Sequence, residues 1–341
     1  MMKLIIQIPC FNEEHTLKDT VADLPRTLPG IDIIEFLVID DGSSDRTIAV
    51  AEEAGVDHIL ANACNLGLAR SFARGVNFAL GAGADIIVNT DGDNQYCGHD
   101  IGKLVQPIVE ARADIVVGDR QTSKIDHFSP SKRLLQSTGS TIVRGFSGVQ
   151  IPDAVSGFRA FSRDAAMRLN IVSTFSYTIE MLIQAGHKGM AVESVPIRTN
   201  SKTRESRLFK SIPNFVRKSG MTTLLMYAMY QPLRIFSFIG AVIALIGAIP
   251  LIRFLYYYLF EDGAGKIQSL VIGSALLTAG AITFVIGLLA DLVGRNRQLI
   301  ELTLERVQKL ELGGSGRAPR PIGEHKPVDE EFERESKDQH R

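Results

Sequence analysis

Two long uncharged stretches limit what this 341-residue chain can fold into more than any other feature does. Residues 235–252 are 18 residues without a charge, and residues 267–290 are 24. A helix of about 20 apolar residues crosses the hydrocarbon core of a bilayer. The joining segment, "EDGAGK", is short, so residues 233–294 are predicted to form a hairpin of two transmembrane helices. The alternative is a helical hairpin buried inside a soluble fold.

Positive charge is distributed unevenly around this hairpin. The loop holds only Lys266, whereas Arg295 and Arg297 follow the second stretch. Seven basic residues precede the first: Lys202, Arg204, Arg207, Lys210, Arg217, Lys218 and Arg234. Because Lys and Arg accumulate on the cytoplasmic side of membrane proteins, we expect an integral protein of the plasma membrane, inner membrane or an equivalent. Both termini are predicted to be cytoplasmic.

The segments that flank the hairpin have their own patterns. In residues 205–232 the apolar side chains Leu208, Phe209, Ile212, Phe215 and Val216 share one helical face. This pattern is typical of amphipathic helices lying in the membrane interface; the alternative is an ordinary surface helix. Residues 295–312 are predicted to form a charged cytoplasmic helix. The polar, Gly- and Pro-rich residues 313–341 are predicted to be a disordered tail.

Residues 1–204 alternate short apolar runs with amphipathic stretches. The runs "KLIIQI", "EFLVID", "DIIVNT" and "DIVVGD" are typical of buried strands, which predicts an α/β domain with a mostly parallel sheet. Ligands of such sheets bind outside the carboxyl ends of the strands. Asp40, Asn89 and Asp119 close three of the runs, so polar side chains are expected to gather at one rim.

Composition excludes two other kinds of site. The formal net charge is −1, which suggests no nucleic-acid partner. The three cysteines, Cys10, Cys64 and Cys97, form no CxxC pair and no metal-binding spacing. They are expected to be reduced thiols of a cytosolic domain.

The segment "NTDGDNQY" places Asp91 and Asp93 directly after a predicted strand. Residues i and i+2 of an extended segment point the same way, so both carboxylates can meet one ligand. Gly92 between them is expected to let that ligand approach the backbone. Oxygen ligands without His or Cys suit Mg²⁺ or Mn²⁺, which share their coordination with substrate phosphates. The pair is therefore predicted to hold a divalent cation that bridges to a diphosphate.

Two further motifs follow predicted strands. "IPCFNEE" contains Glu13 and Glu14, which are expected to begin a helix, where acids favour the positive end of the dipole. "VIDDGSSDRT" contains Asp40 and Asp41 just before a glycine. Helix capping is the alternative explanation for the polar residues of both motifs, but it does not account for two adjacent aspartates.

These motifs in this order, with "NLGLARSFARG", "GDR" and "SGFRAFSR", resemble the family 2 glycosyltransferases of GT-A fold. Within them the chain is similar to the polyprenyl-phosphate glycosyltransferases, the group of dolichol-phosphate mannose synthase. The resemblance covers residues 3 to about 210, and the hairpin by architecture only. The sequence departs from the family pattern after Gln95, where the usual His-Pro-Pro-Glu is replaced by Tyr96, Cys97, Gly98 and His99.

The resemblance implies roles for particular residues. The nucleotide-sugar site is expected to include Pro9, Phe11, Asn12, Glu13, Asp41 and Asp91. The metal and donor diphosphate are expected at Asp91, Asp93 and Gln95. Arg120 and Arg133 are expected near the phosphates of acceptor or donor, with Arg198 and Arg204 as weaker candidates for the acceptor phosphate. Asp153, in "IPDAVSGFR", is a candidate base or orienting residue, with a turn cap as the alternative.

The predicted function is inverting transfer of a sugar from a nucleotide sugar to a polyprenyl phosphate at the cytoplasmic membrane face. The lipid's phosphate oxygen is the nucleophile and is already charged near neutral pH, so a general base matters less than for a hydroxyl. One alternative is a processive polysaccharide synthase, which relies on a QxxRW segment; this chain has no Trp. Another is a non-catalytic membrane scaffold. Whether the chain forms a homo-oligomer stays open.

Overall fold

The computed structural model describes residues 1–121, 144, 148–171, 177–200, 230–260 and 267–311. Several expectations lie outside these residues. They are the interfacial helices up to residue 229, the hairpin loop, the tail, Arg133 and Arg204.

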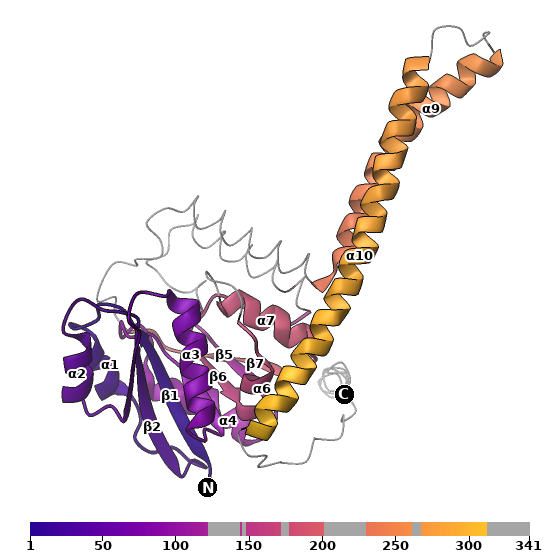
Figure 1. Cartoon of the computed structure of the whole chain (residues 1–341). Helices are drawn as coiled ribbons and strands as arrows, with labels where there is room; N and C mark the ends of the chain where they lie inside the picture. The colour runs from indigo at the N-terminus through magenta and orange to yellow at the C-terminus, as the bar shows by residue number, and fades with distance from the viewer. Residues whose placement is uncertain (122–143, 145–147, 172–176, 201–229, 261–266, 312–341) are drawn as a thin grey trace, which may run out of the picture.

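The N-terminal part is an α/β domain built on one seven-stranded sheet (Figure 1). The strands are β1 (Lys3–Cys10), β2 (Ile33–Asp40), β3 (His58–Ala61), β4 (Ile86–Asn89), β5 (Ile115–Asp119), β6 (Arg159–Ser162) and β7 (Val192–Pro196). Their spatial order is β3-β2-β1-β4-β6-β5-β7. Only β6 runs antiparallel to its neighbours, β4 and β5. The prediction of a mostly parallel sheet is confirmed.

Helices cover both faces of the sheet because successive strand residues point to opposite sides. On one face Ile5, Leu37 and Ile39 pack with α3 (Leu68–Gly81), α6 (Arg163–Arg168) and α7 (Tyr177–His187). On the other face Leu4 and Ile6 pack with α1 (Leu17–Asp23), α2 (Thr47–Glu53) and α4 (Ile101–Val109). The short 3-10 helix η1 (Gly98–Asp100) leads into α4. Two apolar cores therefore hold the sheet rigid beneath its rim.

The first helix begins later than the sequence indicates. Glu13 and Glu14 precede α1, which starts at Leu17. Asn12 has a left-handed φ of 55°, and the N–H groups of Thr16 and Leu17 both donate to the carbonyl of Glu13. The segment after β1 is thus a turn, and its acids are placed by that turn rather than by a helix.

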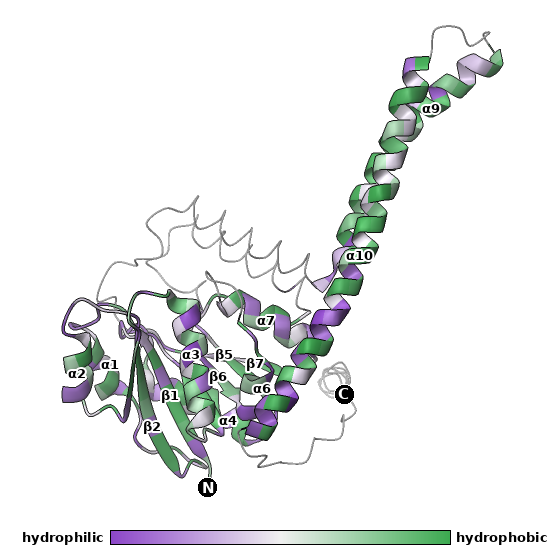
Figure 2. Cartoon of the chain, in the orientation of Figure 1, coloured by the Kyte–Doolittle hydropathy of each residue, from purple (hydrophilic) through white to green (hydrophobic). Residues whose placement is uncertain are grey.

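Two long helices form a hairpin that projects from the α/β domain, α9 (Pro232–Phe260) and α10 (Ile267–Glu311). Both are long and apolar enough to cross a membrane, and each contains an 18-residue window of high mean hydropathy, 2.6 in α9 and 2.2 in α10. Figure 2 shows that apolar residues dominate the projecting part, whereas purple residues appear where α10 reaches the domain. The second predicted span and the predicted charged helix that follows it are therefore one uninterrupted helix as far as Glu311, the last described residue.

Glycines spaced seven residues apart bring α9 and α10 together. A Cβ on Gly240 would lie 2.8 Å from the carbonyl oxygen of Gly280, and a Cβ on Gly280 would lie 2.7 Å from that of Gly240. Gly247 and Gly273 face each other in the same way. Small residues permit such close backbone approach in membranes, where dispersion rather than the hydrophobic effect drives helix association.

The end of α10 that is distant from the hairpin loop is fastened to the α/β domain. Lys188, just after α7, lies 2.8 Å from Glu301 of α10, and both side chains are largely buried. Arg297 pairs with the other oxygen of Glu301 at 2.8 Å and stacks over the ring of Tyr230. The hairpin and the domain are thus linked by a shared carboxylate.

Candidate active site

The structure brings the predicted polar strand ends to one edge of the sheet. β1, β2 and β4 are mutually parallel, and β5 runs in the same direction because both β4 and β5 are antiparallel to β6. Asp40, Asn89 and Asp119 are the last residues of β2, β4 and β5. This edge is where open α/β sheets bind ligands.

Hydrogen bonds join the "FNEE" and "DGSSDRT" segments into one wall of the site. The N–H of Asn12 donates to Ser43 Oγ at 2.9 Å, and its side-chain oxygen accepts from the N–H of Ser44 at 2.8 Å. The N–H of Glu13 donates to Thr47 Oγ1 at 2.9 Å. Two motifs whose bonded residues lie 31 to 34 positions apart in the chain therefore form one structural unit.

Pro9 and Phe11 stand at the end of β1 beside this wall. Pro9 is buried in the strand, in register with Ile39 of β2. The Phe11 side chain, in contrast, is 37% exposed. An exposed ring at a strand end offers an apolar surface, and the nucleotide role of Phe11 stays a prediction.

The two adjacent aspartates at the end of β2, Asp40 and Asp41, have different hydrogen-bond partners. Asp41 is buried and accepts from Asn62 Nδ2 at 2.8 Å and from the N–H groups of Leu66 and Gly67 at 2.8 and 2.9 Å. It therefore holds the "NLG" loop in place. Asp40 uses one oxygen for the N–H of Ser43, while its buried Oδ1 has no hydrogen-bond partner among the described residues.

The glycine of the "DGD" turn is required by packing. A Cβ on Gly92 would lie 2.8 Å from Cys10 Sγ. The Gly92 carbonyl accepts from the hydroxyls of Thr16 and Thr20 at 2.8 and 3.1 Å. This close approach of the turn to β1 is a reason for glycine in addition to the expected approach of a ligand to the backbone, which stays a prediction.

A buried polar layer supports Asp91 from below. A Cβ on Gly157 would lie 3.2 Å from each Asp91 carboxylate oxygen, so a larger residue there would crowd that carboxylate. The Gly157 N–H donates to the hydroxyl of Tyr96 at 3.1 Å, and its carbonyl accepts from Asn89 Nδ2 at 2.9 Å. Burial, reinforced by the Asp91 carboxylate, raises the pKa of Tyr96 to about 12.

Arg120 and Asp153 form a bidentate ion pair. Arg120 Nε lies 2.7 Å from Asp153 Oδ2, and Nη2 lies 3.0 Å from Oδ1. Burial opposes the charge on Arg120, but Tyr96, Asp153 and Asp91 outweigh it and raise the arginine's pKa above its ordinary value. A carboxylate with both oxygens bound by a permanent cation is a weak base. The geometry therefore favours Asp153 as the orienting partner of Arg120 over a general base.

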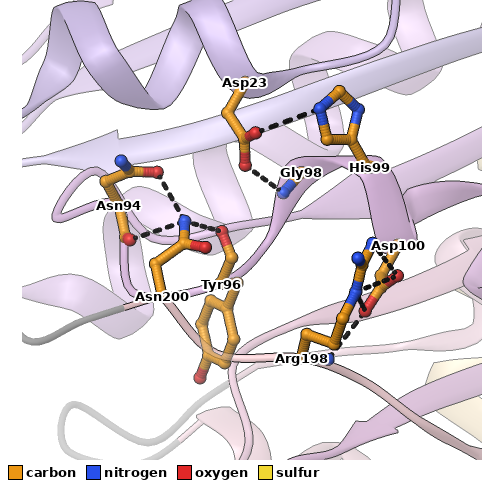
Figure 3. Close-up of polar contacts among 8 residues, drawn as sticks. All are labelled: Asp23, Asn94, Tyr96, Gly98, His99, Asp100, Arg198 and Asn200. Atoms are coloured by element: carbon orange, nitrogen blue, oxygen red, sulfur yellow. Dashed lines mark hydrogen bonds and ion pairs between the residues drawn. The ribbon is translucent and has the colours of Figure 1, made fainter.

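Arg198 has a carboxylate of its own (Figure 3). Its Nη2 lies 2.9 Å from Asp100 Oδ1, and its backbone N–H donates to Asp100 Oδ2 at 2.7 Å. Burial opposes the Asp100 charge, yet the bonds from Arg198 and Lys103 hold the pKa of Asp100 below its usual range. Arg198 is thus engaged in holding the start of α4.

The residues present suit a shared divalent cation. Within the described residues no three or more His, Cys, Asp or Glu side chains are grouped to hold a metal ion. Asp91, Asp93 and Gln95 supply oxygen donors on one turn, and the Gln95 N–H donates to Asp93 Oδ1 at 3.3 Å. Mg²⁺ and Mn²⁺ accept such incomplete oxygen sets because water and substrate phosphates complete them.

Sequence reasoning assigned no role to three residues beneath the site. Arg159 is fully buried, and its guanidinium donates to the carbonyls of Ala154, Ser156 and Thr178 at 2.7–2.8 Å. Burial lowers the pKa of Arg159 to about 10. Tyr177 accepts from Asn89 at 3.1 Å, and Tyr96 stacks on Phe158. The "SGFRAFSR" segment was a signal for Arg159, but its contact with Thr178, 19 residues away, depends on the folded chain.

The fold is that of GT-A glycosyltransferases. It matches glucosyl-3-phosphoglycerate synthase of Mycobacterium tuberculosis, crystallised with Mn²⁺, uridine diphosphate and phosphoglyceric acid, with a TM-score of 0.52. The match covers 66% of this chain and 78% of that one, at 18% sequence identity. At this low identity the match shows a shared fold, the GT-A fold, and nothing about the substrate.

Sequence comparison then places the chain within that class. Residues 5–169 match the model of glycosyl transferase family 2. An uncharacterized protein of Methanocaldococcus jannaschii is 30% identical over 205 residues, covering 58% of this chain and 81% of the relative. The chain belongs to glycosyl transferase family 2 and is a glycosyltransferase. The alternative of a non-catalytic scaffold is thereby set aside.

Two characterised relatives have informative names. The polyprenol monophosphomannose synthase of Mycolicibacterium smegmatis is 26% identical over 206 residues, 57% of this chain and 76% of the relative. The undecaprenyl-phosphate mannosyltransferase of Micrococcus luteus is 27% identical over 207 residues, 58% and 83%.

Proposed function

We propose that this glycosyltransferase moves a sugar from a nucleotide-sugar donor to the phosphate of a polyprenyl lipid at the cytoplasmic face of a membrane. The observation that carries the proposal is the union, in one chain, of the rim described above with two apolar helices exposed along most of their length. The names of the Mycolicibacterium and Micrococcus relatives support the same acceptor class.

The physical reason for the hairpin is the cost of extracting a lipid. Burying one methylene group in a bilayer is worth about 0.8 kcal/mol, so lifting ten chain carbons into water would cost roughly 8 kcal/mol. It is less costly to hold the enzyme at the membrane surface. The hairpin and its ion pair to the domain provide that placement.

The proposed reaction is a single displacement. A phosphate oxygen of the lipid forms a bond to the anomeric carbon, the bond from that carbon to the donor diphosphate breaks, and the configuration inverts. Arg120, oriented by Asp153, would bind the acceptor phosphate and so reduce the repulsion between two anions. Asp91, Asp93 and Gln95 would hold Mg²⁺ or Mn²⁺, which when bound supplies charge stabilisation to the departing nucleoside diphosphate. The "FNEE" wall would hold the nucleotide.

Direct transfer is the test of this function. Membranes containing the full chain are incubated with added polyprenyl phosphate and a panel of radiolabelled UDP-, GDP- and CDP-sugars. Label is then followed into an organic-extractable lipid. Label in lipid that needs added acceptor supports the proposal, whereas label only in a water-soluble polymer would support the processive synthase instead.

The membrane orientation is tested separately. Single cysteines are placed at positions 263 and 315, in a background lacking Cys64, and labelled with an impermeant maleimide. We expect position 263 to react only from the non-cytoplasmic side and position 315 only from the cytoplasm. Reaction of both from one side would mean that the hairpin does not span the bilayer.

A further inference from the structure

The turn between the proposed metal residues needs support. Asn94, between Asp93 and Gln95, has a φ of 52°, in the left-handed region. Asparagine visits this region more readily than other non-glycine residues, but the conformation still needs neighbouring contacts to hold it. The direction of the Asp93 and Gln95 side chains depends on this turn.

Asn200 supplies those contacts, as Figure 3 shows. Its side-chain Nδ2 lies 3.2 Å from the carbonyl oxygen of Asn94, 3.2 Å from Asn94 Oδ1 and 3.3 Å from the carbonyl oxygen of Tyr96. Its backbone N–H donates to the carbonyl of Gln95 at 2.9 Å. One residue thus reaches all three positions from 94 to 96. Because an amide group has two hydrogens, the three side-chain contacts share them.

The segment that carries Asn200 is itself fixed. Thr199 forms an antiparallel bridge with Tyr96, and the N–H of Cys97 donates to the carbonyl of Arg198 at 3.3 Å. Arg198 is held in turn by Asp100, whose side chain is 1% exposed. Asn200 therefore holds the turn from a segment that is itself anchored at Asp100, the residue that precedes α4.

We propose that Asn200 is a positioning residue for the metal-binding turn. By holding residues 94–96, it sets the placement of Asp93 and Gln95 as metal ligands. The inference rests on the proposed divalent-cation site and names a residue outside the "DGD" motif that serves it. Groups that orient metal ligands typically change metal affinity by about 10- to 100-fold when they are removed.

The test compares Asn200→Ala with Asn170→Ala in the purified full chain in detergent micelles. Asn170 is similarly half-buried, but its hydrogen bonds to Gln184 use only its backbone, so its side chain can be removed without loss of these bonds. Two quantities are measured: the dissociation constant of Mn²⁺, from the loss of the free-ion electron paramagnetic resonance signal, and hydrogen–deuterium exchange of the amides of residues 94–97.

Asn200→Ala is expected to weaken Mn²⁺ binding about tenfold and to speed exchange in residues 94–97, while Asn170→Ala changes neither. The proposal requires both changes. An unaltered Mn²⁺ constant, or unaltered exchange at the turn, would overturn it. If Asn200→Ala does not fold, Asn200→Ser is measured in its place under the same criteria.

Neither measurement uses a sugar donor or a lipid acceptor. A wild-type protein that binds Mn²⁺ but transfers no sugar to lipid would therefore contradict the proposed acceptor. The positioning role of Asn200 would still be decided by the Mn²⁺ dissociation constants and the exchange rates. A wild type that binds no Mn²⁺ would overturn the positioning role, whatever the acceptor.

Discussion

Single residues at the rim are held by buried partners from distant parts of the chain. Arg159 donates to the carbonyls of Ala154 and Ser156, in the loop that carries Asp153, and to that of Thr178 in α7. Asp153 in turn binds Arg120. A buried polar group without such partners would be costly. The candidate site is therefore the exposed surface of a polar network, and changes beneath it should alter its chemistry.

The first residue-scale prediction concerns the metal. Asp93→Ala should abolish transfer and leave the fold intact, because it removes one of few ligands and leaves diphosphate charge uncompensated. EDTA should reproduce the loss in the wild type, and added Mg²⁺ or Mn²⁺ should reverse it. Transfer assays and circular dichroism check both statements; full activity in chelator would contradict the metal assignment.

The second concerns the Arg120–Asp153 pair. Arg120→Lys keeps the charge but loses the bidentate fork. With a charge-assisted hydrogen bond worth about 1.5–3 kcal/mol, transfer should fall roughly 10- to 150-fold. Donor affinity, measured by calorimetric titration, should be unchanged. The matched control is Arg198→Lys, which alters the same kind of pair at Asp100.

Two results would oppose this assignment. An equal loss of donor affinity would place Arg120 in the donor site rather than the acceptor site. An equal loss of transfer in Arg198→Lys would mean that both arginines hold loops, or that Arg198 also meets the acceptor phosphate as the sequence resemblance implies.

At the scale of elements, the hairpin depends on close contact between glycines. Gly280→Leu should separate α9 from α10, because a side chain there would strike the backbone of Gly240. Overpacking of this kind typically costs about 1–3 kcal/mol. The exposed neighbour Ala279→Leu is the control. We expect a lower thermal midpoint in detergent for Gly280→Leu only; equal midpoints would mean that the seam does not stabilise the hairpin.

For the molecule as a whole, the joint between hairpin and domain determines where the rim lies relative to the bilayer. Lys188→Met removes the ion pair to Glu301, a loss of about 1.5 kcal/mol of docking free energy or more. Transfer to a long polyprenyl phosphate in vesicles should fall severalfold, whereas transfer to a short, water-soluble isoprenoid phosphate should not. Equal loss with both acceptors would show that Lys188 stabilises the domain generally.

Sequence by itself determined the parts of this protein that depend on local pattern. Strand-length apolar runs, uncharged stretches of membrane-spanning length and polar strand ends are properties of contiguous residues. They were sufficient to predict the parallel sheet, the hairpin and the rim where Asp91 and Asp93 lie. The continuity of α10 through residue 311 was missed, because a change from apolar to charged residues resembles a boundary although the backbone helix continues.

Only the tertiary structure decided which side chains meet. Asp153 and Arg120 are 33 residues apart, and Asn200 and Asn94 are 106 apart. Their contacts depend on the order of strands, with β6 inserted between β4 and β5, and no local pattern encodes that order. The same holds for Gly92 and Gly157, whose lack of a side chain is explained by neighbours that only the folded chain brings within reach. Local pattern selects the elements, and packing between distant segments selects the partners of each functional group.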